Sequence, residues 1–187
     1  RRYRSDGLTC YTAAKRSNAI NNVGQGYSWA VEAKNSATSA ADPYALKSFE
    51  ELWTMVTPES INDMGTILQT LIDAYLYTDD EKYGKAGLVL LDRIADLYPN
   101  VEFIGTEKEC ATEQILAKAY DAFYPIVGNT EVIDFLSGKA AALGLVNDKS
   151  YADKICVNIE DNIIRTIRDL SERPEMMDNY GMQQAAL

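Results

Sequence analysis

Hydrophobic residues recur every three or four positions along most of this chain, which is the spacing of one face of an α-helix. The clearest stripe, in residues 58–77, consists of Met64, Ile67, Leu68, Leu71, Ile72 and Tyr75. Similar stripes predict helices over about 43–56, 81–98, 109–123, 132–143 and 151–172. No segment shows the apolar–polar alternation of a half-buried strand. The pattern therefore predicts an all-α protein.

Cap and turn residues divide these stripes. Asp42 and Thr57 each precede a proline, an arrangement typical of a helix start. Residues 78–81 (Thr-Asp-Asp-Glu) have the spacing of a capping box, in which Thr78 and Glu81 satisfy each other's backbone amides. A connection this short forces the helices on either side of it to run antiparallel. We therefore expect a run of antiparallel helix hairpins over residues 42–187.

Residues 1–41 lack this regularity, and we expect an irregular N-terminal segment there. Residues 18–28 are rich in Asn and Gly and predict a loop, and residues 36–41 are small and polar, which is typical of a linker. The chain starts at Arg1 and stops at Leu187 within an expected helix, so we expect both ends to be cut ends. The apolar runs are too short to cross a membrane.

The charge and composition exclude several kinds of partner. The 187 residues carry 28 acidic and 18 basic side chains, a net charge of −10, which disfavours nucleic acid and anionic membrane surfaces. An anionic polysaccharide would need a local basic pocket. There is no histidine, so the commonest general base and metal ligand is missing. Cys10, Cys110 and Cys156 form no metal-binding spacing; we favour three buried, inert thiols over one disulfide. No metal or cofactor is expected.

Three segments together resemble a known family. Residues 74–83, 90–99 and 116–125 are similar, in this order, to hairpins of the incomplete (α/α) toroid in heparinase II/III-like and alginate-lyase-like polysaccharide lyases. Residues 179–184 resemble a further segment of the same proteins. The resemblance covers roughly residues 42–187, and the Thr-Asp-Asp-Glu-Lys-Tyr turn also occurs in (α/α)-toroid glycoside hydrolases. It implies that the helix hairpins form part of such a toroid.

The resemblance also implies β-elimination on a uronate-containing glycan. In such lyases a substrate carboxylate is neutralised, and a Tyr or His removes the adjacent proton while the linked sugar leaves. Asn179 would be the carboxylate partner, and Tyr180 would belong to the substrate-binding corner. Gln183 stands where the family has a histidine, and an amide cannot transfer a proton at neutral pH. The resemblance places the usual catalytic Tyr and further histidines beyond Leu187. Asn179 also fits a plain helix cap.

Other residues have two interpretations. Tyr27 and Trp29, beside glycines in the N-terminal segment, are candidates to stack on sugars, whereas the helix-stripe aromatics are better explained as core. Arg168 could bind a uronate, but it and Arg165 lie among acidic residues and fit intrahelical ion pairs better. Asp92 and Arg93 are expected on a solvated helix side. Acidic residues at 107, 109 and 113 suit a helix N-terminus better than a hydrolase carboxylate pair.

The expected function is therefore a fragment of a secreted or periplasmic polysaccharide lyase whose ligand is an anionic polysaccharide or oligosaccharide. The first alternative is a non-catalytic helical carbohydrate-binding or scaffold module, which the absence of histidine favours for this chain alone. The second is an (α/α)-toroid glycoside hydrolase. A partial toroid would leave apolar helix faces uncovered, so self-association is also expected.

Overall fold

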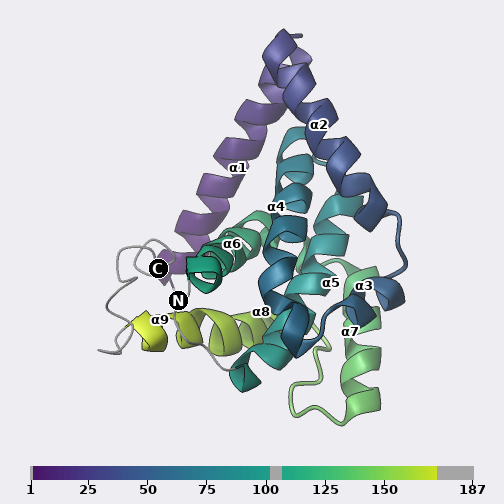
Figure 1. Cartoon of the computed structure of the whole chain (residues 1–187), viewed down its shortest axis with the longest axis vertical. Helices are drawn as coiled ribbons and strands as arrows, with labels where there is room; N and C mark the ends of the chain where they lie inside the picture. The colour runs from purple at the N-terminus through teal and green to yellow at the C-terminus, as the bar shows by residue number, and fades with distance from the viewer. Residues whose placement is uncertain (1, 102–106, 172–187) are drawn as a thin grey trace.

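The structure is a computed structural model that describes the backbone of residues 2–101 and 107–171 and the side chains of residues 12–101 and 108–169. The described residues are helical and contain no strand, which confirms the all-α prediction. The α-helices are α1 (Arg2–Gly24), α2 (Ser28–Ala45), α3 (Phe49–Met55), α4 (Ile61–Thr78), α5 (Glu81–Leu97), α6 (Glu107–Phe123), α7 (Thr130–Leu143), α8 (Ala152–Ile159) and α9 (Arg165–Ser171) (Figure 1).

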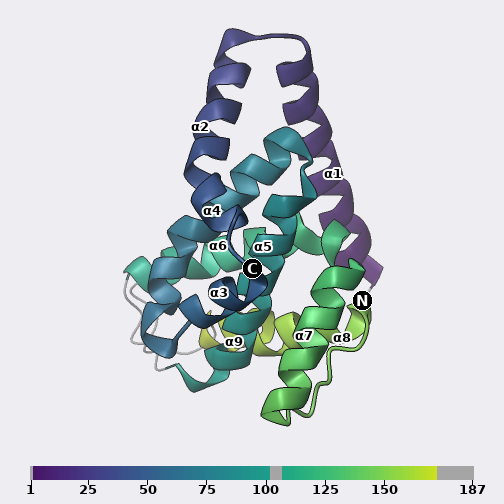
Figure 2. The ribbon, with the colours of Figure 1, turned by 90° about the vertical axis from the view of Figure 1, so that its right-hand side faces the viewer.

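The N-terminal part differs from the expectation, because α1 and α2 make a long helix hairpin in place of an irregular segment. The two helices converge at an apex that extends beyond the other helices (Figures 1 and 2). The Asn-rich stretch stays helical to Gly24, and the amide of Asn22 bonds Asn18 one turn earlier at 3.3 Å. Only the turn needs glycine, since Gly26 has a φ of +72°.

The expected linker over residues 36–41 is also wrong, because it lies inside α2. Small side chains let α2 pack closely against α4, and Ala41 is fully buried there. Pro43 does not begin a helix either; it lies in the last turn of α2. The next helix, α3, begins instead at Ser48, which forms a capping box with Glu51.

The α4–α5 hairpin confirms the central prediction, although its cap differs. Thr78 is the last residue of α4, and its hydroxyl donates back to the Ala74 carbonyl at 2.6 Å. Asp79 adopts the left-handed conformation, with a φ of 56°. The N-cap of α5 is Asp80, whose carboxylate accepts from the Lys82 amide at 3.0 Å. The helices stop and start where the pattern predicted, but a different side chain makes the cap.

The core lies between two sets of helices. On one side α4 packs between α2 and α6, and on the other α5 contacts α3, α7 and α8. Helix α6 approaches α5 closely at Gly87, where an added Cβ would lie 2.2 Å from the Phe123 ring. The stripe aromatics Tyr75, Tyr83, Tyr98, Tyr120 and Phe123 are all buried, which confirms their interpretation as core residues.

The C-terminal helical run lies across the lower ends of the other helices in the view of Figure 1. Helix α7 ends where the 132–143 stripe predicted, and Gly144 follows it in the left-handed conformation. Helix α8 continues through a π-helical turn, Glu160–Ile164, into α9. The predicted isoleucine stripe of this run is buried: Ile155, Ile159, Ile163 and Ile167. This stripe holds the run against α5 and neighbouring segments.

Candidate functional site

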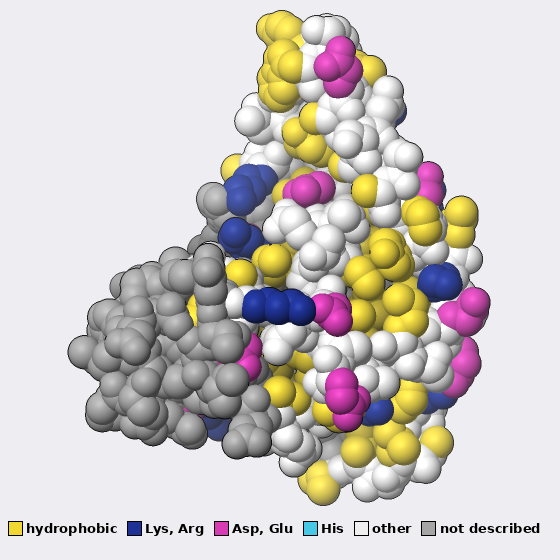
Figure 3. All heavy atoms as spheres, viewed as in Figure 1, with side chains coloured by type: hydrophobic (Ala, Val, Ile, Leu, Met, Phe, Trp, Pro, Cys, Tyr) yellow, Lys and Arg dark blue, Asp and Glu magenta, His cyan; other side chains and the backbone are white. Residues whose placement is uncertain are grey.

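Two of the predicted sugar-binding residues lie together at the apex of the α1–α2 hairpin. Tyr27 precedes α2 and Trp29 lies in its first turn. Their ring centroids are 6.3 Å apart and their planes differ by 21°. Tyr27 is 50% exposed and Trp29 is 56% exposed, although large aromatic side chains are usually well buried. Hydrophobic side chains gather at this apex in the space-filling view (Figure 3). The pair therefore forms an accessible aromatic surface.

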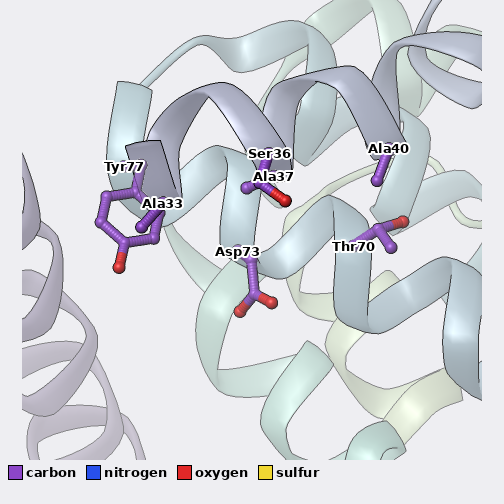
Figure 4. A pocket seen from close by; sticks show the side chains of 7 residues that line it. All are labelled: Ala33, Ser36, Ala37, Ala40, Thr70, Asp73 and Tyr77. Atoms are coloured by element: carbon purple, nitrogen blue, oxygen red, sulfur yellow. The ribbon is translucent and has the colours of Figure 1, made fainter. Parts of the chain in front are cut away.

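A shallow groove between α2 and α4 lies farther down the same hairpin helix. It has a volume of about 410 Å³. From α2 it is lined by the small residues Ala33, Ser36, Ala37 and Ala40. From α4 it is lined by Thr70, Asp73 and Tyr77 (Figure 4). The volume is within the range of small-molecule sites, and the lining combines an apolar floor with a few polar groups.

Asp73 is the charged residue of this groove. Its carboxylate accepts a hydrogen bond of 2.8 Å from the amide of Gln69. Partial burial raises the pKa of Asp73, while the Gln69 bond and the charges of Lys118 and Lys15 act in the opposite direction. Tyr77 is one of the helix-stripe aromatics interpreted as core, but it is only partly buried and lines the groove, and Thr70 and Asp73 were not predicted as site residues. Their spacing of three and four residues is a signal that would have placed them on one helix face.

The other predicted site residues are not brought to this region. Arg168 lies in α9, at the opposite end of the molecule from the hairpin apex (Figure 1). Its guanidinium bonds Asp169 at 2.8 Å, and Arg165 pairs with Asp161 one turn earlier on the same run. These pairs agree with the ion-pair interpretation. Asn179, Tyr180 and Gln183 lie outside the described residues.

The most strongly buried polar cluster was not predicted. The ammonium of Lys149, in the α7–α8 connection, bonds the Asp92 carboxylate and both oxygens of Asp96 at 2.7 and 2.8 Å. The amide of Asn158 on α8 bonds Asp92 at 2.9 Å and Asp96 at 3.0 Å. Lys149 and Asp92 are each 0% exposed. The cluster therefore ties the connection and α8 to α5.

The expectation that Asp92 and Arg93 lie on a solvated side of α5 is wrong. Burial raises the pKa of Asp92 to about 6, against the opposing attraction of Lys149. The guanidinium of Arg93 lies 3.9 Å from the centroid of the Trp53 ring. Both side chains are covered because α3, α8 and the connection pack on this side of α5. No ligand can reach Asp92 or Lys149 in this conformation, so the cluster is structural.

A second polar cluster lies where α5 and α6 meet. Glu109 is 6% and Glu113 2% exposed, and the Tyr98 ring is buried against Glu113. Burial and the charge of Glu109 raise the pKa of Glu113 to about 7. Glu109 lies in the first turn of α6, as the helix N-terminus interpretation expects, and Glu113 lies in its second turn; both are buried. A carboxylic acid with a raised pKa is typical of the general acid in a glycoside hydrolase, but Glu113 is buried and not accessible to a glycan.

The described residues offer no group of three or more Cys, Asp and Glu side chains arranged to hold a metal ion. The thiols of Cys110 and Cys156 are free; Cys110 is buried and Cys156 partly so. Burial raises the pKa of both thiols, which disfavours the reactive thiolate. The side chain of Cys10 lies outside the described residues. Among the described helices, none is long and apolar enough to cross a membrane.

The chain was compared with models of known protein families, with curated proteins and with solved structures, and no match was found. The candidate site is therefore defined by the residues of this chain alone. The accessible polar and aromatic groups that the structure brings together are those of α2 and α4. They suit binding of a polar, ring-containing ligand better than acid–base chemistry.

Proposed function

We propose that this chain is the helical part of a polysaccharide lyase that cleaves a uronate-containing glycan by β-elimination. The observation that carries the proposal is the placement of the family-like segments. Residues 74–83 and 90–99 span the α4–α5 hairpin, and residues 116–125 begin within α6, which packs beside α4. Successive hairpins that place every second helix on the same side are what an (α/α) toroid requires. This arrangement supports the toroid and, through the resemblance, the lyase.

In this proposal the reacting groups belong to the segment with Asn179, Tyr180 and Gln183, while the described helices hold and bind the polymer. Asn179 neutralises the uronate carboxylate, which lowers the cost of removing the neighbouring proton. Gln183 donates a hydrogen bond but cannot act as the base. The proton passes to the Tyr or His that the resemblance places beyond Leu187, and the electron pair left on carbon forms the double bond while the C4–O bond to the linked sugar breaks. A polymeric substrate is met outside the cytoplasm, so we also propose a secreted or periplasmic location.

Incubation with alginate, heparin and chondroitin tests the proposal. The test uses the protein extended beyond Leu187 to include that base: there a lyase releases an unsaturated uronate that absorbs in the ultraviolet, and Asn179→Ala should abolish that signal. Asn35→Ala, at an exposed position of α2, is the matched control and should leave the signal unchanged. New reducing ends without the chromophore would refute elimination and point to a hydrolase.

The second candidate is a non-catalytic carbohydrate-binding or scaffold module. The exposed Tyr27–Trp29 pair favours it, because a binding surface needs no proton-transferring residue, and the chain contains no histidine. Binding of these polymers without any product would support the module over the lyase. Self-association stays a prediction of both candidates, and light scattering measures it: a stable monomer would contradict it.

A further inference from the structure

The groove and the apex aromatic pair lie on one face of α2. Trp29, Ala33, Ala37 and Ala40 are separated by four, four and three residues, the spacing of neighbours along one side of a helix. The groove lining begins at Ala33, one turn beyond Trp29. From Trp29 to Ala40 the helix rises about 16 Å, at about 1.5 Å per residue. We call this face, with Tyr27 and the groove residues of α4, the α2 track.

Helix α4 determines the order in which polar and aromatic groups follow one another along the α2 track. Helices α2 and α4 run antiparallel, so Tyr77 lies beside Ala33 and Thr70 beside Ala40 (Figure 4). Asp73 lies between them. An extended ligand starting at the apex would therefore meet Tyr27 and Trp29, then Tyr77, then the carboxylate of Asp73 and finally the hydroxyl of Thr70. Aromatic faces come first and hydrogen-bonding groups follow.

These groups select for the chemistry of a sugar chain. An exposed aromatic ring offers a flat apolar face to the C–H face of a sugar ring. A carboxylate accepts several hydrogen bonds, and Gln69 supplies one of them to Asp73, so the group can also accept from sugar hydroxyls. The small α2 side chains leave room for a ring to approach the helix. The length favours several linked rings over a single one.

The negative charge of Asp73 makes the α2 track more favourable for neutral sugars than for anionic ones. Lys15 and Lys118 act on Asp73 electrostatically, but neither lines the groove. A uronate carboxylate in the groove beside Asp73 would therefore be repelled by it, whereas a neutral ring brings hydroxyl donors. We propose that the α2 track binds neutral, hydroxyl-rich rings of a glycan chain, with Tyr27 and Trp29 as stacking platform and Asp73 as hydrogen-bond acceptor. This inference rests on the glycan-directed function proposed above and adds which rings are held, and where. In a polymer that alternates uronate and neutral rings, the α2 track holds a neutral ring.

Calorimetric titration of the whole chain tests this with two probes of equal length. The first is hexa-N-acetylchitohexaose (called chitohexaose below), which is neutral because every amine is acetylated, and the mannuronate hexamer carries a carboxylate on every ring. We expect saturable binding of chitohexaose and at least tenfold weaker binding of the mannuronate hexamer. Equal affinity for both, or no heat with chitohexaose, would overturn the proposal.

Matched variants locate the binding. Trp29→Ala and Asp73→Asn should each weaken chitohexaose binding about tenfold. Asp73→Asn should also reduce the ratio of the affinity for chitohexaose to the affinity for the mannuronate hexamer. Tyr151→Ala, which removes a 52% exposed ring elsewhere, and Asp134→Asn, an exposed carboxylate on α7, are the controls and should bind as the parent chain does. A control that loses as much affinity as its partner variant would show that binding lies elsewhere.

A spectroscopic readout checks that the ligand contacts Trp29 itself. The chain has two tryptophans, and Trp53 is covered by Arg93 and Lys139. In Trp53→Phe, chitohexaose should therefore shift and protect the remaining indole fluorescence against acrylamide quenching. An unchanged spectrum at saturating ligand would remove Trp29 from the site.

The outcome separates this inference from the lyase proposal. Binding at the α2 track without unsaturated product would keep the inference and reject the lyase. Product formed from a uronate polymer at the same KM by the parent chain and by Trp29→Ala would keep the lyase and reject the α2 track as a substrate site.

Discussion

The α1–α2 hairpin and the cluster of Lys149, Asp92, Asp96 and Asn158 beneath α5 differ in how far their polar and aromatic groups are exposed. At the hairpin apex two large aromatic rings are exposed, and farther along α2 the Asp73 carboxylate of α4 lines an open groove. Beneath α5, a lysine and an aspartate are fully buried and bonded to each other. Burying an ion costs several kcal/mol unless partners satisfy it, so the lower cluster is committed to holding the fold. The hairpin groups remain accessible to a ligand.

Lys149→Met should destabilise the protein by about 3–5 kcal/mol, because it leaves Asp92 and Asp96 buried without their cation. Urea unfolding followed by circular dichroism measures the loss. Lys154→Met is the control: Lys154 pairs with Asp148 at 2.6 Å on the exposed side of the same connection, and a surface pair contributes about 0–1 kcal/mol. Similar losses in the two variants would mean that the buried cluster does not hold α8 to α5.

Glu113→Gln should remove a pH dependence of stability. The pKa of Glu113 is about 7 in the folded protein, whereas its ordinary value is 4.5. Between pH 4.5 and pH 7 the folded state therefore binds more protons than the unfolded state. Stability should therefore fall as pH rises from about 4.5 to about 7, by about 3 kcal/mol. The Gln variant should lack this fall and be more stable than the parent at pH 8. Unfolding curves at pH 5 and pH 8 give the comparison, and parallel pH profiles would contradict it.

Gly87→Ala should cost about 1–3 kcal/mol, because its Cβ would overlap the buried Phe123 ring and force α5 and α6 apart. Gly138→Ala provides the matched change in α7, where an added Cβ meets nothing within 4 Å. That substitution should stabilise the helix by about 0.5–1 kcal/mol. Thermal melts of both variants measure this, and two shifts of the same sign would refute the close α5–α6 packing.

Tyr27→Ala and Trp29→Ala should change the free energy of unfolding by less than about 0.5 kcal/mol, as is usual for exposed positions. The Trp29 variant should still lose glycan affinity. A large loss of stability would mean that the apex aromatics serve the fold, and the contrast between the two regions would disappear.

Much of the fold was predictable because helical periodicity is a local property. The stripe from Met64 to Tyr75 and the end of the 132–143 helix each depend on residues within about one or two turns, and both were predicted correctly. The capping box at Thr78 was misassigned by two residues, because several adjacent polar side chains compete for one cap. The helices of residues 2–45 were missed because Asn-rich and small polar stretches favour loops only when nothing packs on them.

The site was less predictable than the fold. Tyr27 and Trp29 were singled out because aromatics beside glycines in a polar segment are unusual, and the structure places them together at the apex, remote from Arg168. Tyr77 was interpreted as core, and Asp73 was not predicted, because both stand in a strongly apolar helix where periodicity gives no sign of a groove. Asp73 and Tyr77 line a groove only because α2 lies opposite them. Helix α2 comes more than thirty residues earlier and contributes the small side chains of the other wall.

The sequence by itself determined where the central helices begin and end, since caps, turns and hydrophobic spacing act over a few residues. Only the tertiary structure decided which faces of those helices are covered. Asp92 looked solvated from its neighbours on α5, yet it is buried by Lys149, 57 residues away, and by Asn158, 66 residues away. Burial and charge pairing depend on such distant partners, whereas helix formation is settled locally.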